Sequence, residues 1–394
     1  MLYSFLLFVF LLFVLCLACS LLFFCVFSGY YTNNYYVDDY VNGELVKRDI
    51  ENLEEPKILI ENVDIIWEAI PYSHFLVDNS TPIQEVLLTE RTGYVHHVSP
   101  IEERNKVLRI PGVFTDNESG LLGLALHPNF NENKLFYIYY TTIIGGEVTN
   151  QVVRYRLTDN IELTDRKIIL DGIPAGSQHD GGRIAFGQDG YLYIATGDSD
   201  NPSLAQDLTS LAGKILRITD DGEIPSDNPY VSNAYVNTNN IKQEIYSYGH
   251  RNPQGLAWDS QGNLWSTEHG PIAHDKINKI VKGGNYGWGL EGSSEFIEPY
   301  LSSGIETWAP SGAAILNDVL YFGSLRGESL FELDLKDPEK KLKRHLQRQY
   351  GRLRAVQIKD GKLFLGTSNR DGYSTLRPGD DKLLVFNMFP YESI

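Results

Sequence analysis

The sequence predicts an all-β fold, a six-bladed β-propeller, preceded by an N-terminal transmembrane helix. Two observations predict the propeller. A short apolar strand ending in a hydroxyl residue recurs six times, and the chain holds 24 Tyr but only 2 Met, which favours strands over helices. A third observation predicts the helix, because residues 1–29 contain no charged side chain and consist mainly of Leu, Phe, Val and Cys.

Each repeat is an apolar run bordered by a turn that contains Gly, Asn or Asp. The hydroxyl residues that mark the six copies, 43 to 71 residues apart, are Thr89, Thr141, Thr196, Thr267, Ser324 and Thr367. Irregular repeats of this length are typical of propellers with four-stranded blades. Because a ring must close, Ile58–Trp67 is expected to complete the last blade beside Lys382–Phe386. A β-sandwich, or a pair of β-domains, is the alternative.

The charge of the chain limits the possible partners. The formal net charge is −17, with 51 Asp and Glu against 34 Lys and Arg. Phosphate backbones and anionic membrane surfaces both attract basic faces, so this balance argues against nucleic acid and against electrostatic membrane binding. Contact with a membrane is expected only through the N-terminal helix.

The N-terminal segment divides the chain into three parts: a membrane anchor or uncleaved signal (1–29), a polar tether (30–55) and the propeller (56–394). The uncharged run is longer than the apolar core of most cleaved leaders and lacks a basic start. A cleaved leader or a lipid anchor at Ala18-Cys19 is the alternative. All three cysteines lie in this run, so the remaining chain suits an oxidising space. We therefore expect the propeller outside the cytoplasm, in the periplasm or at the cell surface.

Two residues have the pattern of a proton-transfer pair. His179 lies in Gln178-His179-Asp180-Gly181-Gly182-Arg183, before an apolar strand, and Asp198 ends the next strand of the same repeat. Histidine can accept a proton near neutral pH, and a carboxylate beside it can orient the ring. Each residue alone is equally compatible with an ordinary turn, His179 bonded to backbone and Asp198 capping a hairpin.

Cationic and amide side chains recur in loops of later repeats. They are Arg251, Asn252 and Gln254 in Gly249–Gly255, Arg326 after the fifth marker, and Arg352 and Arg354 before the last strand pair. Guanidinium groups bind carboxylates through a planar fork of donors. Singly, each Arg fits a surface position. Together, in so acidic a protein, they predict a site for a multiply anionic ligand.

Oxygen-rich residues follow within 19 positions: Glu268, the carbonyls of Gly270 and Pro271, Asp275 and Tyr286. Hard oxygen ligands suit Ca²⁺, although the spacing differs from an EF-hand loop. The motifs of a zinc site, a P-loop, a dinucleotide site and a serine-hydrolase elbow are all missing from the sequence.

These segments resemble the pyrroloquinoline-quinone (PQQ)-dependent soluble aldose and glucose dehydrogenases. The resemblance covers about residues 60 to 390 and rests on Gly120–Phe130, His179–Arg183, His250–Gly255, Glu268–Pro271, Lys282–Trp288, Trp308–Gly312 and Arg352–Arg354. It implies a six-bladed propeller that oxidises an aldose at C1 to the lactone. The hydride would go to PQQ. The electron acceptor that reoxidises the cofactor is not named by the sequence, and a membrane tether would place the enzyme near a quinone or a small redox protein.

The resemblance also implies roles for single residues. His179 would be the base that takes the C1 hydroxyl proton, with Arg251 and Asp198 beside it as catalytic groups. The cofactor-binding residues would be Arg251, Asn252, Gln254, Arg326, Arg352, Arg354 and Trp308. Glu118, where the family usually has Gln, would contact the substrate, and Gly270, Pro271 and Tyr286 would bind Ca²⁺. A lysine next to Asp275, Lys276, opposes a second, structural Ca²⁺.

Two other functions fit the same sequence. One is a non-catalytic binding module similar to the propeller of Hedgehog-interacting proteins, although such a module has no need for His179 and the four arginines. The other is a Ca²⁺-dependent sugar lactonase, which would hydrolyse gluconolactone without PQQ.

Overall fold

The computed structural model describes residues 36–41, 44–49, 55–74, 83–231, 239–290 and 295–388. The chain divides into two units, residues 1–53 and 54–394. In the first unit, β1 (Tyr36–Val41) and β2 (Glu44–Asp49) pair as an antiparallel hairpin within the predicted tether. The predicted anchor, residues 1–29, lies outside the described residues. Within the described ranges, no helix is long and apolar enough to cross a membrane.

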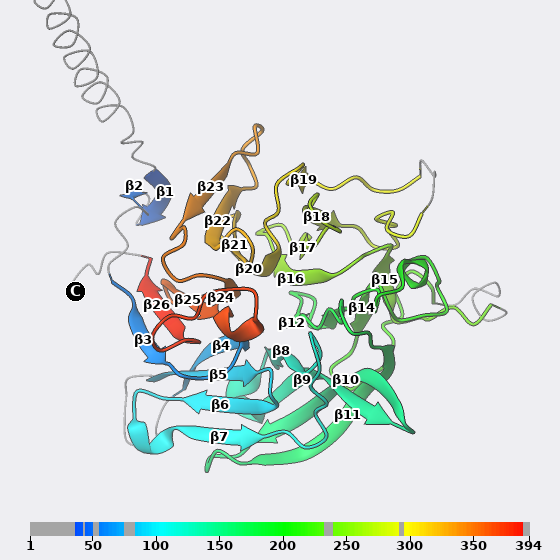
Figure 1. Ribbon diagram of the computed structural model, residues 1–394, viewed down its shortest axis with the longest axis horizontal. Helices are drawn as coiled ribbons and strands as arrows, with labels where there is room; N and C mark the ends of the chain where they lie inside the picture. Colours follow the sequence, from blue (N-terminus) through cyan, green and yellow to red (C-terminus); the bar gives the residue numbers. More distant parts are fainter. Residues whose placement is uncertain are drawn as a thin grey trace, which may run out of the picture. The chain divides into compact units, whose positions relative to one another are not determined.

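The second unit confirms the predicted six-bladed propeller. Its described residues form six antiparallel sheets of four strands each (Figure 1). The first three blades are β4 (Ile66–His74), β5 (Ile83–Glu90), β6 (Tyr94–Val98) and β7 (Lys106–Arg109); β8 (Leu121–Leu126), β9 (Leu135–Ile144), β10 (Glu147–Leu157) and β11 (Leu163–Pro174); and β12 (Ile184–Phe186), β13 (Leu192–Ala195), β14 (Lys214–Ile218) and β15 (Ile245–Tyr248).

The other three blades are β16 (Pro253–Trp258), β17 (Leu264–Glu268), β18 (Lys276–Ile280) and β19 (Leu301–Ser302); β20 (Pro310–Leu316), β21 (Val319–Ser324), β22 (Ser329–Asp334) and β23 (Leu342–His345); and β24 (Leu353–Lys359), β25 (Lys362–Thr367) and β26 (Leu383–Asn387) with β3 (Lys57–Ile60). The described helices are short and lie in loops: η2 (Glu102–Arg104), α2 (Phe130–Asn133), η3 (Pro202–Ala205) and η4 (Asn369–Asp371). The first strand of each blade packs against the first strands of both neighbours, so these six strands line the centre of the ring.

The ring closes through a strand from the beginning of the unit. In the sixth blade β3 pairs antiparallel with β26, and Ile58 lies opposite Leu384. The predicted closing segment Ile58–Trp67 is therefore divided, because the closing strand ends at Ile60 and Trp67 belongs to β4 in the first blade. Closure joins the two ends of the unit in one sheet, which removes two exposed sheet edges.

The blades bury both of their faces. All residues of β9 from Leu135 to Thr142 are buried, and Tyr137, Tyr139 and Tyr140 are among the largest fully buried side chains of the described residues. A blade lies between two neighbours, so its strands read as continuous apolar runs rather than as alternating ones. This explains why each repeat was visible in the sequence as an apolar run.

The hydroxyl residues that mark the repeats occupy similar positions in their blades. Each lies in the later part of the second strand of its blade or directly after it, and each is fully buried. The hydroxyl of Thr89 donates to the Leu122 carbonyl of the next blade at 2.6 Å, and that of Thr267 donates to the Ser311 carbonyl of the next blade at 2.6 Å. A small side chain with one donor satisfies a buried carbonyl without filling the channel.

Candidate active site

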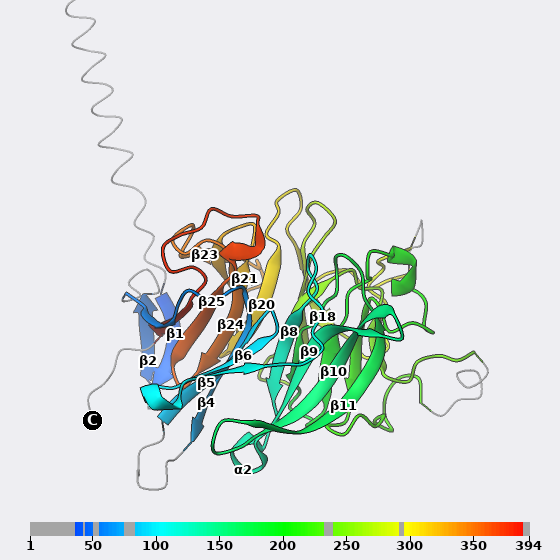
Figure 2. The ribbon, with the colours of Figure 1, turned by 60° about the horizontal axis from the view of Figure 1, so that its bottom comes forward.

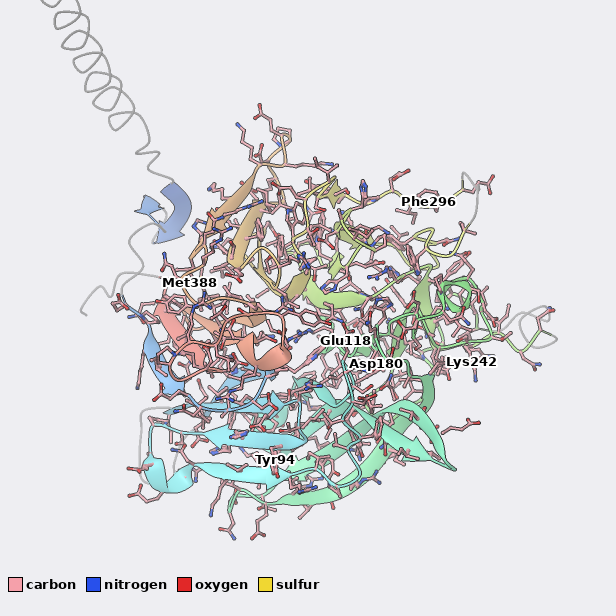
Figure 3. All side chains as sticks on the ribbon, viewed as in Figure 1. Tyr94, Glu118, Asp180, Lys242, Phe296 and Met388 are labelled. Carbon is pink, nitrogen blue, oxygen red and sulfur yellow. The ribbon has the colours of Figure 1, made fainter. Side chains whose placement is uncertain are left out.

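The predicted site residues lie on loops at one end of the propeller. Glu118, His179, Arg251 and Arg352 all precede the first strand of a blade. Because these strands surround the centre, the loops that lead into them meet at one mouth. Figure 3 labels Glu118 and Asp180 near the centre of the ring. In the tilted view of Figure 2 the red loop with η4 and the yellow loops rise on the side opposite α2.

His179 and Asp198 form a directly bonded pair at this mouth. Nδ1 of His179 lies 2.8 Å from Oδ1 of Asp198. Asp198 is buried and also accepts from the indole Nε1 of Trp288 at 2.7 Å. A carboxylate only accepts, so Nδ1 carries the proton and Nε2 is left with a lone pair. None of the described residues bonds to Nε2.

The backbone at His179 is held in a conformation that favours glycine. Its φ is +59°, which costs on the order of 1 kcal/mol or more for a residue with a side chain. Its N–H donates to Oε2 of Glu118 at 2.8 Å. Its carbonyl lies so close to Gly197 that a Cβ on Gly197 would come within 1.7 Å of the carbonyl oxygen. The position of His179 therefore requires both Glu118 and a glycine at 197.

Glu268 holds the loop that carries Arg251 in place through two hydrogen bonds. Oε1 of Glu268 accepts from the backbone N–H of Arg251 at 2.7 Å, and Oε2 lies 2.9 Å from Nδ1 of His250. Burial alone would raise the pKa of this carboxyl, but the charge of Lys276 and the hydrogen bond from His250 outweigh burial and lower the pKa to about 2. Glu268 is thus an ionised anchor of the loop.

The Arg251 guanidinium has no hydrogen-bond acceptor and no ion-pair partner among the described residues. It lies over the ring of Trp288, 5.5 Å from its centroid, and none of the described residues accepts a hydrogen bond from it. Burial lowers the pKa of Arg251, although Asp198 and Glu118 attract its charge. Its charge is therefore available for an anionic ligand next to His179.

Asn252 and Gln254 are bonded to the protein itself. Oδ1 of Asn252 accepts from the backbone N–H of Gly181 at 3.2 Å and from Nε2 of Gln254 at 2.9 Å. Both side chains are buried. They join the third and fourth blades beside the His179 loop.

The predicted arginine pair of the sixth blade is separated by a carboxylate. Oδ2 of Asp371 accepts from Nε of Arg352 at 2.6 Å and lies 4.0 Å from Nη2 of Arg354. Arg354 also lies 3.5 Å from Oε1 of Gln254, which connects it with the Arg251 loop. Burial lowers the pKa of Arg354 to about 10, because one distant carboxylate compensates its charge only in part.

Arg326 is exposed, next to the Leu325 carbonyl that accepts from Nη1 of Arg352 at 3.2 Å. His179, Asp198, Glu118 and the four arginines thus form a continuous group around the mouth.

The side chains of two predicted site residues contact the blades instead of this group. The ring of Trp308 packs against Phe322 and Phe331 in the core of the fifth blade, and its indole N–H donates to Glu306. The hydroxyl of Tyr286 donates to the Lys279 carbonyl and accepts from Val281. Lys279 lies three residues along β18 from the end nearest Gly270, about 10 Å away.

The turn at Gly270 and Pro271 presents free carbonyl groups. None of the described residues donates a hydrogen bond to either carbonyl oxygen, and the Gly270 N–H donates to Oδ1 of Asp275 at 2.9 Å. A Cβ on Gly270 would lie 1.9 Å from the Ala273 carbonyl oxygen, so the turn requires glycine. Among the described residues, no cluster of three His, Cys, Asp or Glu side chains could hold a metal. A cation here would depend on backbone oxygens and on the ligand.

Sequence reasoning missed several residues of the site. Nε2 of His269 is buried without a hydrogen-bond partner, and burial together with the charges of Arg251 and Arg354 lowers its pKa to about 3. Arg183 is buried in an ion pair with Glu68 and lies over Trp67, 4.4 Å from the ring centroid. His269 and Arg183 stood inside segments singled out from the sequence, but a lone acid such as Glu68 or Asp371 carried no local signal.

Known proteins resemble this chain in sequence and in fold. The family model described as Glucose / Sorbosone dehydrogenase matches residues 73–377. An aldose sugar dehydrogenase of Escherichia coli K12 is 36% identical over 238 residues, which cover 58% of this chain and 62% of that protein. Quinoprotein glucose dehydrogenase B of Acinetobacter calcoaceticus is 35% identical over 62% of this chain and 54% of its own length. The chain thus spans less than two thirds of these curated relatives.

A solved structure is similar over a larger part. The PQQ-bound aldose sugar dehydrogenase of Streptomyces coelicolor is 34% identical, with a TM-score of 0.73, and the match covers 85% of this chain and 98% of that one.

Proposed function

The chain belongs to the glucose/sorbosone dehydrogenase family, and from this premise we propose that it is an oxidoreductase that oxidises an aldose sugar at C1 to the lactone, using PQQ and Ca²⁺. Two proteins similar to it are named as an aldose sugar dehydrogenase and a quinoprotein glucose dehydrogenase, and a third was solved with PQQ bound. The observation that carries the proposal is the open Nε2 of His179 beside the unpaired guanidinium of Arg251.

His179 is the base in this proposal. Its Nε2 lone pair takes the proton of the sugar C1 hydroxyl while a hydride leaves C1 and the C1–O bond becomes a carbonyl. Asp198 accepts from Nδ1, which fixes the reactive tautomer and stabilises the imidazolium that forms. Glu118, bonded to the backbone of His179, would contact a hydroxyl group of the sugar.

The residues present fit the cofactor. PQQ, when bound, supplies the hydride acceptor and three carboxylates. Arg251 and Arg354 offer guanidinium groups whose charge the protein compensates only in part, Arg326 offers an exposed one, and His269 offers a buried ring nitrogen without a partner. Asn252 and Gln254 would hold the loops in place. Trp308 would act from the core by positioning the loop that contacts Arg326.

A calcium ion fits the turn at Gly270 and Pro271. Hard carbonyl oxygens are ligands that Ca²⁺ accepts, and two of them are free of hydrogen bonds from the described residues. The ion would complete its shell with ligand and water oxygens. Because the Tyr286 hydroxyl is bonded to the fourth blade, we assign that residue a supporting position behind His250, on whose ring it stacks at 4.6 Å.

The cellular setting is part of the same proposal. We place the propeller outside the cytoplasm, anchored through residues 1–29, with a quinone or a small redox protein as the electron acceptor. The long uncharged run and the lack of cysteine after Cys25 support this setting.

The test begins with the purified full chain freed of cofactor. Titration with PQQ in the presence of Ca²⁺, followed by absorbance, should show saturable binding, and the loaded protein should reduce a small redox dye with at least one aldose. His179→Ala should retain binding but lose dye reduction. Absence of both binding and dye reduction with a broad panel of aldoses would refute the proposal. Hydrolysis of gluconolactone without PQQ would favour the lactonase instead.

A further inference from the structure

Five loops at the mouth of the site form a continuous surface, which we call the arc: residues 269–275, 303–309, 325–328, 346–352 and 368–382. Neighbouring loops are joined by hydrogen bonds from His274 N to Gly304 O (2.8 Å), from Arg326 N to Trp308 O (3.1 Å), from Arg348 N to Glu328 O (2.7 Å) and from Asn369 Nδ2 to Tyr350 O (2.9 Å). The arc contains Pro271, Arg326 and Arg352, so it borders the site itself.

The arc carries the three most exposed large apolar side chains among the described residues, and a fourth exposed one. Ile305 is 93% exposed, Ile272 is 86% exposed and Tyr373 is 74% exposed, and Leu376 is 57% exposed. Ile272 and Ile305 lie on adjoining loops, since Thr307 donates to the Ile272 carbonyl at 2.6 Å. Apolar side chains grouped in this way around a functional opening indicate a contact surface for a partner.

These loops hold six Lys and Arg and six Asp and Glu, but the exposed side chains among them that have no ion pair in the described residues are arginines. Arg326, Arg348 and Arg370 are exposed. The carboxylates of these loops are either buried, as Asp275, Asp380 and Asp381 are, or paired with an arginine: Glu306 with Arg344, Glu328 with Arg377 and Asp371 with Arg352. Unpaired cations therefore predominate locally on a protein whose net charge is −17.

We propose that the arc is the docking surface for a one-electron redox protein whose contact face has an apolar centre ringed by carboxylates. The proposal rests on the proposed function. Oxidation of one aldose to its lactone releases two electrons and two protons. Two acceptor molecules, each holding one copper or haem iron, take one electron each in turn, and the protons pass to water. Transient electron-transfer contacts are small, and charges at their rim steer the encounter.

A membrane surface fits the arc less well. Anionic headgroups attract local arginines, but they repel the remaining charge of a protein at −17. The apolar side chains stand on separate loops around an opening, whereas surface-bound membrane segments are usually continuous amphipathic helices. Arg and Tyr are also the residues enriched at protein–protein contacts.

The experiment compares two acceptors on the PQQ-loaded full chain. An acidic plastocyanin-type copper protein is the probe, and a small uncharged dye reports turnover without docking. The double variant Arg348→Glu/Arg370→Glu should lower kcat/KM for the copper protein about tenfold at low salt and much less at high salt. Leu376→Ser/Ile305→Ser should lower it at both salt concentrations. Dye reduction should stay unchanged in both variants.

Lys57→Glu/Lys359→Glu is the matched control, because it reverses two exposed charges away from the arc. Loss of copper-protein reduction in this control to the same extent would overturn the proposal, since net charge alone would then explain the effect. Equal rates in all variants would overturn it as well. A wild-type chain that reduces neither acceptor would instead count against the proposed function. If the wild-type chain sediments with phosphatidylserine vesicles and Arg348→Glu/Arg370→Glu abolishes this, the arc binds a membrane surface and the redox-protein proposal is overturned.

Discussion

The described part of the propeller holds several pairs of a histidine and a carboxylate, and these pairs differ in whether the second ring nitrogen of the histidine has a partner. In the first blade, His97 lies between Glu85 and the Arg104 carbonyl, at 3.0 Å and 2.8 Å from its two ring nitrogens, and both side chains of the pair are fully buried. At the mouth, His179 contacts Asp198 through Nδ1, and its side chain is 13% exposed. The two pairs have the same chemistry but opposite surroundings.

The difference shows what makes such a pair functional. His250 also has both ring nitrogens occupied, by Glu268 and by Ser247 at 2.9 Å each. A ring held on both sides has no lone pair to offer and acts as a hydrogen-bonded part of the core. His179 is held on one side only, so the carboxylate orients it and the second nitrogen remains reactive. The two residue types in a histidine–carboxylate pair therefore do not show whether the pair can act as a base. That depends on whether the second ring nitrogen of the histidine has a hydrogen-bond partner.

The largest effect should come from removing one histidine of each kind. His179→Gln should lower kcat for aldose oxidation roughly 10³-fold, because a general base is lost, with little change in Tm. His97→Gln should leave kcat of the folded enzyme unchanged but lower the free energy of unfolding by about 2 kcal/mol, because buried partners lose a bond. Steady-state kinetics and urea denaturation of both variants measure the two effects. A large loss of kcat in His97→Gln would show that the buried pair also takes part in catalysis, and the contrast between the two pairs would be wrong.

The sequence predicted the six-bladed propeller, but it did not predict which histidine has a free second ring nitrogen. Apolar runs with turn residues predict blades because strand burial and turn chemistry are local properties. His179 and Asp198 were found because each lies in a glycine-containing turn. Trp308 and Tyr286 show the limit, since a buried aromatic in a core and one against a ligand look alike in a sequence. Asp371 and Glu68 meet their arginines only through the closed ring, at separations that no local pattern reports.

A smaller effect should follow when the orienting group is altered. Asp198 accepts from His179, from the Asp200 backbone at 3.1 Å and from Trp288, and the single carbonyl oxygen of an amide cannot serve all three donors. Asp198→Asn should lower kcat on the order of 10²-fold and leave PQQ affinity nearly unchanged. Asp200→Asn is the control, because Oδ1 of Asp200 lies 3.7 Å from the same ring nitrogen. If kcat falls equally in both variants, the negative charge near His179, and not the hydrogen bond from Asp198, determines kcat.

Two arginines differ in the same way, one at the mouth with few partners and one in a blade with several. Arg354 at the mouth is partly exposed, with one carboxylate at 4.0 Å, whereas the buried Arg217 in the third blade is bonded to Asp189 and Asp227 at 2.8 to 3.0 Å. Arg354→Met should weaken PQQ binding about 10- to 100-fold, the loss of one charge-assisted contact, without lowering Tm. Arg217→Met should lower Tm and leave PQQ affinity unchanged. Absorbance titration and thermal melts distinguish these outcomes, and reduced Tm in Arg354→Met would mark that residue as structural.

The smallest effect concerns a pair at the edge of the fifth blade. Burial would raise the pKa of Glu332, but hydrogen bonds from His345 at 3.0 Å and Lys343 at 2.8 Å outweigh burial, so the pKa is lowered from its ordinary value of 4.5. A carboxyl with a lowered pKa in the folded state contributes stability above pH 4.5 that is lost as the pH falls further. His345→Gln leaves Lys343 in place, so it should cost only about 1 kcal/mol at pH 7. That cost should shrink as urea denaturation is repeated at progressively lower pH below 4.5, because Glu332 no longer attracts either partner once it is protonated. A cost that stays constant down to the pH at which the folded protein is lost would mean that His345 contributes through packing, and the carboxylate would then play no part in this pair.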